Sequence, residues 1–405
     1  MEQWNAVLPP GIAAAALDLV AALAGRPRPA PTCVRPDLDG GGPGLALAYH
    51  QLDLSLPGGG WDVPALGYLA ASAAGAERLP SSFPGLFGGL AGLAFTAWTL
   101  TRDPDLLPAV HDTILREATA RARALEDHLH GVPVRTFDVV SGLTGTGAYL
   151  LCRHHEPATR RALRAVLCAL VTLCGEHTGT PHWHTPAAEI RNTTTRQGFP
   201  HGLLDCGLAH GVAGPLALLA LALGAGIVVA GQTETVTRTA HWLAAQRLDD
   251  EHGPHWLGQI APPGHPTATG PRVIPSSWCY GTPGIARSLW LAATALNDPA
   301  LRSLAVQALK AVHHRTAAQR SRPSAAGLCH GLAGLLHITT RLAHDTKDPE
   351  LAHAAAELSE NLLASHASVT TAGPGFLDGA SGVTLALLAA ATDTPPAWDR
   401  ALLLA

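Results

Sequence analysis

The sequence has 405 residues, of which 47% are hydrophobic and 14% charged, so it can build a large core and is not intrinsically disordered. Its net charge of −4, without a basic stripe or block, argues against a nucleic-acid binder. Because no basic segment followed by an apolar one stands near its start, we identify no signal peptide and expect a cytoplasmic protein.

A Gly-x-x-Gly pair followed by an apolar run recurs along the chain. The seven pairs are Gly41/Gly44, Gly89/Gly92, Gly142/Gly145, Gly211/Gly214, Gly281/Gly284, Gly331/Gly334 and Gly379/Gly382. The runs are apolar on nearly every side, which is typical of helices that are buried all round. We therefore expect seven buried helices, each entered through a tight glycine turn.

More amphipathic segments alternate with these apolar runs and predict partly exposed helices. They cover residues 12–24, 61–76, 104–129, 157–173, 233–248, 299–314 and 349–363. Three of them begin at an Asp-Pro pair, at Asp103, Asp298 and Asp348. An acidic N-cap followed by proline at the first helical position is a good start signal for a helix.

Seven apolar and seven amphipathic helices predict an all-α fold. A linear solenoid of helix pairs needs polar capping repeats, and neither end of this sequence looks like one. We therefore predict a single α/α toroid over residues 1–405, with seven inner and seven outer helices and all glycine turns on one rim. The two longest intervals between turns contain loops at about 175–205 and 249–277, and loops of this length are commonly functional.

One uncharged stretch, residues 211–231, is long enough to span a bilayer. It has no aromatic belt and no flanking basic cluster. We favour a buried helix with Pro215 in its first turn and an end near Gly224 or Gly226.

Unusual residues precede the glycines of the fourth, fifth and sixth turns. They are His210, Cys279, Cys329 and His330. If all turns share one rim, these side chains face the same central space. Two cysteines and one histidine make a three-ligand set suited to zinc with an open fourth position, as in catalytic rather than structural zinc sites.

The remaining cysteines of the seven give weaker signals. Cys152, Cys168 and Cys174 lie within helical runs, and we expect inert core residues. Cys33 precedes the first turn without a partner, and Cys206 precedes the fourth turn as an unneeded ligand. The odd total argues against a disulfide framework.

Three motifs together carry a family resemblance. Trp278-Cys279-Tyr280-Gly281-Thr282-Pro283-Gly284, Cys329-His330-Gly331 and Gly207-Leu208-Ala209-His210-Gly211 resemble the lanthipeptide (lantibiotic) cyclases, the LanC family. The resemblance extends across the chain, because that family is a toroid of seven inner and seven outer helices. It implies one zinc ion held by Cys279, Cys329 and His330.

The resemblance also implies roles for two further residues. His210 would serve as acid and base, and Asp138 would lie close to it. We also expect Trp278 and Tyr280 to contact the substrate. Family members often carry an arginine four residues before the first zinc cysteine, where this sequence has Pro275. Arg272 is the candidate to replace it, whereas Arg287 is expected to be structural.

The implied reaction is addition of precursor-peptide cysteine thiols to dehydroalanine or dehydrobutyrine, which forms (methyl)lanthionine thioether rings. The implied partners are a dehydrated lanthipeptide precursor with leader and core, a separate LanB-type dehydratase, and an exporter at the membrane. A synthetase complex with these partners would associate the protein peripherally with the membrane.

Three alternatives remain open. The first is a related zinc protein that binds glutathione or adds its thiol. The second is a toroidal glycoside hydrolase or terpene cyclase, which would need paired carboxylates or acid-rich motifs, and Asp138 has no obvious partner among the turns. The third is a non-catalytic scaffold of a lanthipeptide synthetase complex.

Overall fold

A computed structural model describes the chain except residues 1–3, 27–29, 32–34, 78–82, 127–130, 178, 267–275, 317–318, 320–325, 366, 368 and 370–372. The described residues fall into two compact units. Unit 1 comprises Met1–Val110 and Arg322–Ala401, and unit 2 comprises His111–Ser321 and Leu402–Ala405. The single domain expected over residues 1–405 stays a prediction.

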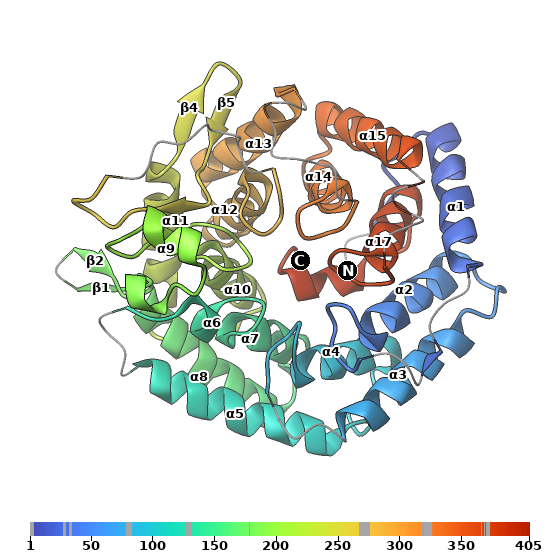
Figure 1. Cartoon of the computed structure of the whole chain (residues 1–405), viewed down its shortest axis with the longest axis horizontal. Helices are drawn as coiled ribbons and strands as arrows, with labels where there is room; N and C mark the ends of the chain where they lie inside the picture. The colour runs from blue at the N-terminus through green and yellow to red at the C-terminus, as the bar shows by residue number, and fades with distance from the viewer. Residues whose placement is uncertain are drawn as a thin grey trace. The chain divides into compact units, whose positions relative to one another are not determined.

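Unit 1 is built from buried inner helices covered by more exposed outer ones. The inner helices are α2 (Gly42–Ser55), α4 (Leu90–Thr101), α14 (Leu332–Thr346) and α17 (Ala380–Ala391). The outer helices are α1 (Pro10–Ala24), α3 (Asp62–Ala76) and α15 (Pro349–Ala364), and the short η3 (Ala397–Leu402) follows α17. Figure 1 shows α15, α1 and α3 outside α14, α17 and α2, against which they pack.

The first and last repeats of the sequence meet within unit 1. Helix α17 packs against both α1 and α2. The Val7 amide donates to the Ala390 carbonyl at 2.9 Å, and the Trp4 indole donates to the Ala389 carbonyl at 2.9 Å. The first and last repeats therefore cover each other within unit 1.

Unit 2 repeats the same layering. Its inner helices are α7 (Leu143–Cys152), α10 (Ala213–Gly224) and α12 (Thr282–Leu296). Its outer helices are α5 (Pro108–Glu126), whose first turn belongs to unit 1, α8 (Pro157–Leu173), α11 (Gln232–Ala245) and α13 (Pro299–His314). Shorter elements are α6 (Val134–Phe137), η2 (Ala187–Glu189) and α9 (Thr193–Gly198).

The inner helices begin where the glycine pairs predict. Each starts one or two residues after the first glycine of its pair. Side-chain atoms are excluded there: a Cβ at Gly211 would collide with the Asp205 carbonyl, and one at Gly284 would collide with the Trp278 carbonyl. The glycines are therefore required because the chain crosses its own backbone at each turn.

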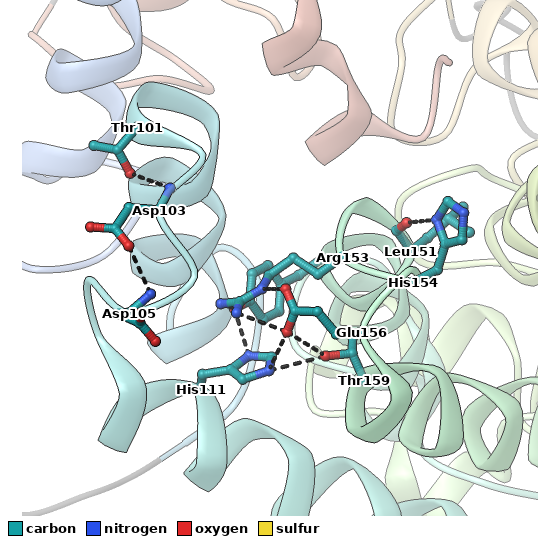
Figure 2. Close-up of polar contacts among 10 residues, drawn as sticks. Thr101, Asp103, Asp105, His111, Leu151, Arg153, His154, Glu156 and Thr159 are labelled. Atoms are coloured by element: carbon teal, nitrogen blue, oxygen red, sulfur yellow. Dashed lines mark hydrogen bonds and ion pairs between the residues drawn. The ribbon is translucent and has the colours of Figure 1, made fainter.

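The outer helices α8 and α13 have their predicted bounds, whereas the predicted start of α5 is wrong. Asp298 and Asp348 cap α13 and α15 as expected, by accepting hydrogen bonds from the backbone amides that follow. Asp103 instead accepts from the Asp105 amide at 2.9 Å, and its own amide donates to Thr101 Oγ1 at 3.1 Å (Figure 2). Because the Asp103 carboxylate already accepts a hydrogen bond within this local turn, it does not cap α5, which begins at Pro108.

The uncharged stretch forms the buried helix that we expected. Helix α10 places Pro215 in its first turn and ends at Gly224, and most of its residues are buried. Among the described residues, no helix is both long and apolar enough to cross a membrane.

Backbone hydrogen bonds connect successive glycine turns. In unit 2 the Val139 amide donates to the Ala209 carbonyl at 2.9 Å, and the Ala209 amide donates to the Cys279 carbonyl at 3.2 Å. Unit 1 repeats the pattern, from Leu328 to Leu377, from Phe376 to Asp39 and from Leu38 to Phe87. These hydrogen bonds thus fix the position of each turn relative to the next turn in the same unit.

The two long loops contain small sheets. The strands are β1 (Glu176–His177), β2 (Thr180–Pro181), β3 (Leu204–Asp205), β4 (Leu248–Asp250), β5 (Gly253–His255) and β6 (Gln259–Ile260). The pairs β1–β2 and β4–β5 are local hairpins, but β3–β6 joins the first loop to the second. In this pair Asp205 lies opposite Gln259.

A polar network connects two outer helices of unit 2, α5 and α8, to the inner helix α7. His111 of α5 hydrogen-bonds to the Tyr149 hydroxyl at 2.8 Å and to the Thr159 hydroxyl at 3.0 Å. Arg153 and Glu156 form an ion pair beside them at 2.6 Å (Figure 2). Because its members satisfy one another, this network stabilises the scaffold behind the third turn.

Candidate active site and metal ligands

A histidine–aspartate pair lies at the fourth turn, in unit 2. His210 Nδ1 is 2.8 Å from Asp138 Oδ2. The other carboxylate oxygen of Asp138 accepts from the backbone amides of Ser141 and Gly142, each at 2.7 Å. Asp138 is 3% exposed, at the end of α6, so its orientation is fixed before any ligand binds. The carboxylate holds the imidazole with Nδ1 protonated, which leaves Nε2 for a substrate.

The surroundings of His210 favour its charged form. Burial lowers the pKa of His210, but the hydrogen bond to Asp138 and the negative charges of Asp138 and Asp205 outweigh it, so the net pKa is raised. Arg121 of α5 holds the backbone beside the pair: its guanidinium donates to the carbonyl of Ser141 at 3.2 Å, and the amide of Ser141 donates to Asp138. A histidine of this kind can donate a proton near neutral pH.

The pair opens onto a cavity of about 340 Å³. The ring of Tyr280 stacks on the ring of His210, with centroids 5.1 Å apart. Both side chains line the cavity, together with Asp138. Residues of the first long loop also line it, among them Ile190, Asn192 and Thr195. The loop predicted to be functional therefore shares this cavity with the histidine.

Sequence reasoning missed one buried carboxyl in this cavity. Asp205 is 2% exposed and lines the cavity with Asp138, and it lies in β3, just before the fourth turn, where the search for a partner among the turns did not reach. Burial raises the pKa of Asp205 to about 6, although the hydrogen bond from Gln259 opposes this shift. The available signal was its position five residues before His210, just ahead of the fourth turn.

The fifth turn, also in unit 2, carries Cys279 between two aromatic residues. Cys279 is 4% exposed, and its thiol lies 3.5 Å from the Ser277 hydroxyl. Trp278 is 1% exposed, and its indole donates to the Leu402 carbonyl at 3.0 Å. This burial disfavours the substrate contact expected of Trp278, whereas Tyr280 reaches the cavity.

The sixth turn, in unit 1, carries Cys329 and His330. Cys329 is partly exposed, and its amide donates to the Leu377 carbonyl at 3.0 Å. His330 Nδ1 lies 3.7 Å from a carboxylate oxygen of Asp378, and more than half of the imidazole is exposed. Cys329 and His330 are thus neighbours on a turn of unit 1, whereas Cys279 lies on a turn of unit 2, and the metal site of these three residues stays a prediction. Two thiolates with one imidazole fit zinc better than magnesium or calcium, which prefer oxygen.

The other sequence candidates have mixed outcomes. Arg272 and Cys33 lie outside the described residues. Arg287 is buried and its guanidinium donates to the Leu404 carbonyl at 2.8 Å, as a structural residue should. Burial raises the pKa of Cys206, so this thiol is a poor ligand.

Among the three cysteines expected in the core, only Cys174 is buried. Cys152 is partly exposed and Cys168 is exposed on the outer helix α8. The helical pattern placed all three in apolar runs, but it could not tell which side of the outer helix faces solvent.

These features define a class of protein. It is an all-α repeat protein whose glycine turns carry a histidine–aspartate pair and cysteine and histidine side chains of the kind that bind zinc. The chain belongs to the lanthionine synthetase C-like protein family, whose model matches residues 32–403.

Two comparisons extend this result. The chain is 25% identical to the nisin biosynthesis protein NisC of Lactococcus lactis subsp. lactis over 310 residues, which are 75% of this chain and 72% of the relative. The solved structure of nisin cyclase matches with a TM-score of 0.78 and 21% identity, over 98% of both chains. This likeness confirms the predicted fold class, the all-α α/α toroid.

Proposed function

We propose that the protein is a zinc-dependent lanthipeptide cyclase. It adds cysteine thiols of a dehydrated precursor peptide to dehydroalanine or dehydrobutyrine of the same peptide, which gives thioether rings. The observation that carries the proposal is the His210–Asp138 pair, open to a cavity, in a chain of the lanthionine synthetase C-like family. We also propose a separate dehydratase and an exporter as partners; the cytoplasmic location with peripheral membrane association stays a prediction.

We assign the metal to Cys279, Cys329 and His330. Support comes from the equivalent positions of the two cysteines in their turns and from the chemistry of the three donors. A zinc ion bound there would keep the substrate thiol deprotonated at neutral pH, where a free thiol is mostly protonated. Arg272 stays the candidate to replace the arginine that family members often carry before the first zinc cysteine.

The remaining chemistry belongs to His210. When the substrate sulfur bonds to the β-carbon of the alkene, the π electrons move toward the carbonyl and form an enolate. His210 Nε2 then donates its proton to the α-carbon, which completes the addition. Asp138 keeps the proton on Nδ1, so Nε2 is the nitrogen that exchanges protons with the substrate. The thiol proton is lost to solvent, and His210 regains its own proton from solvent, so the net reaction conserves atoms and charge.

Tyr280 and the first loop would hold the alkene beside the histidine. Tyr280 limits the rotation of the imidazole by stacking on it. The loop residues that line the cavity would contact the peptide around the reacting residue. Holding both reacting groups in one cavity removes much of the entropic barrier to ring formation.

The test uses the purified protein with zinc and a precursor that contains cysteine and dehydroalanine. Metal analysis should find one zinc per chain, and loss of free thiol without a change in peptide mass should report ring formation. Cys279→Ala and Cys329→Ala should each lose metal and activity together. His353→Ala, at an exposed position of the outer helix α15, serves as the control that keeps both. A protein that binds zinc but forms no ring on any dehydrated peptide would be a scaffold instead.

A further inference from the structure

The buried carboxyl of Asp205 has no part in the steps above, yet it contacts the turn that carries His210. Its Oδ1 accepts from the Gly207 amide at 2.9 Å, and its backbone carbonyl accepts from the Val212 amide at 2.9 Å. These two contacts bracket His210 in the sequence. Asp205 therefore holds both ends of the fourth turn.

The turn is also shaped around this side chain. A Cβ at Gly211 would lie 2.6 Å from Asp205 Oδ1, and one at Gly207 would lie 3.2 Å from it. Backbone atoms lie closer still, the Cys279 carbonyl oxygen to a Cβ at Gly207 and the Asp205 carbonyl oxygen to one at Gly211, so the carboxyl packs against two glycines that the backbone already requires. A smaller residue at position 205 would leave a gap directly under the turn, and the turn could then shift.

The second oxygen of Asp205 connects the turn to the second long loop. Asp205 Oδ2 accepts from Gln259 Nε2 at 3.0 Å. The two residues lie opposite each other in the β3–β6 pair, and the Cys206 amide donates to the Gly258 carbonyl at 2.8 Å. Both Asp205 and Gln259 line the cavity that contains His210. The loop and the turn are therefore joined by side-chain and backbone contacts together.

We propose that Asp205 and Gln259 form a positioning link, through which the second long loop sets the orientation of His210 toward the substrate. The inference rests on the proposed function. Neither residue transfers a proton in this account. Their hydrogen bonds fix where the imidazole points, so their loss should slow the chemical step more than it weakens peptide binding.

The first experiment compares Asp205→Ala with Asp205→Asn. Alanine removes both hydrogen bonds and leaves a gap. Asparagine keeps the shape, accepts from Gly207 through its oxygen, and can donate to Gln259 once the glutamine amide is turned over. We expect Asp205→Ala to lower kcat by about 30-fold with KM within about threefold of the wild type. Asp205→Asn should restore kcat to within about threefold of the wild type.

Two further variants complete the design. Gln259→Leu removes only the link to the loop and should lower kcat by about tenfold, less than Asp205→Ala. Glu234→Ala removes an exposed carboxyl of the same unit on the outer helix α11, outside both long loops, and it should leave kcat and KM unchanged. Thermal unfolding of every variant corrects the rates for the folded fraction.

Some results would overturn the positioning link, and a different result would overturn the proposed function. Unchanged kcat in Asp205→Ala, or equal losses in the alanine and asparagine variants, would overturn the positioning link. So would a loss of rate that merely follows the folded fraction. If the wild type itself forms no rings, the proposed function fails; hydrogen exchange then still tests the link. Amides of residues 206–214 should exchange faster in Asp205→Ala and not in Asp205→Asn, and equal exchange in both would overturn it.

Discussion

Two histidine–aspartate pairs with the same spacing lie in different units of this protein. His210 and Asp138 are 2.8 Å apart in unit 2, and His337 and Asp399 are 2.8 Å apart in unit 1. Each imidazole also lies against an aromatic ring, Tyr280 in the first pair and Trp398 in the second. The distance and the neighbouring ring therefore do not distinguish an active-site pair from a structural one.

Access and charge balance do distinguish them. The His210 side chain is 26% exposed and faces a cavity, whereas both side chains of the second pair are 0% exposed. Asp399 also accepts from Arg341 Nη2 at 2.9 Å. Burial alone would raise the pKa of Asp399, but Arg341 and His337 reverse this and hold it well below its usual range. The second pair is a clamp between α14 and η3, while the first can exchange protons.

The largest effect is expected at the open pair. His210→Gln should lower the cyclisation rate by about 10³-fold, because the variant lacks the group proposed to protonate the α-carbon, and it should leave zinc content unchanged. Its unfolding temperature should stay near that of the wild type. Rate measurements on a dehydrated peptide check this, with the exposed His353→Gln as the control. Retained cyclisation would remove the acid/base role of His210.

The closed pair should respond in the opposite way. Asp399→Asn leaves Arg341 and His337 without their counter-charge and should lower the free energy of unfolding by about 3 kcal/mol. The rate per folded molecule should not change. Urea unfolding measures the first quantity, and Glu357→Gln on the exposed face of α15 is the matched control. A variant that keeps its stability would contradict the clamp.

Asp138→Asn should separate orientation from proton transfer. An amide in place of the carboxylate no longer favours protonated Nδ1, so the rate should fall by about 10²-fold, less than in His210→Gln. Stability should change less than in Asp399→Asn. If the two active-site variants lose equal activity, the two side chains act as a single unit.

The aromatic neighbour of the open pair should matter least for activity. Tyr280→Leu removes the ring that stacks on His210, and a loss of about fivefold is expected from the energy of one aromatic pair. Tyr280→Phe keeps the ring and should keep the rate. Equal losses in both variants would mean that the hydroxyl, rather than stacking, is what matters.

The pH dependence of stability gives the smallest test. The pKa of Asp399 is lower in the folded state than in the unfolded state, so its contribution is complete above the unfolded pKa and is lost as the pH falls. The stability difference between wild type and Asp399→Asn should therefore shrink by about 1 kcal/mol between pH 7 and pH 3. Urea midpoints of both proteins at the two pH values measure it, and a constant difference would contradict this account.

Much of the fold could be predicted because glycines mark each repeat, and a side chain at such a glycine would collide with the backbone of the same turn. The first glycine of each pair fixed the start of an inner helix, and Asp-Pro pairs fixed the starts of α13 and α15. The same signal failed at Asp103, where the side chain caps a short turn instead. A pattern of residue types cannot decide between two nearby amides that compete for one carboxylate.

The site could be predicted only in part. The contact between His210 and Asp138 followed from the family resemblance and is present. Asp205 and Gln259 were not predicted, because they meet through a two-residue strand pair between loops that are distant in the sequence. The burial of Trp278 was also missed, since it depends on the chain end at Leu402.

The hydrogen bonds from turn to turn have a consequence for how such a chain tolerates variation. Val139, Ala209 and Cys279 are joined through their backbones, so an extra residue inside one turn would disturb its neighbours. The two long loops of unit 2 instead lie just before the fourth and fifth turns, outside the turns themselves. Loops can thus be added or exchanged there while His210 and Asp138 keep their spacing, and under the proposed function this would separate the choice of substrate from the residues that act on it.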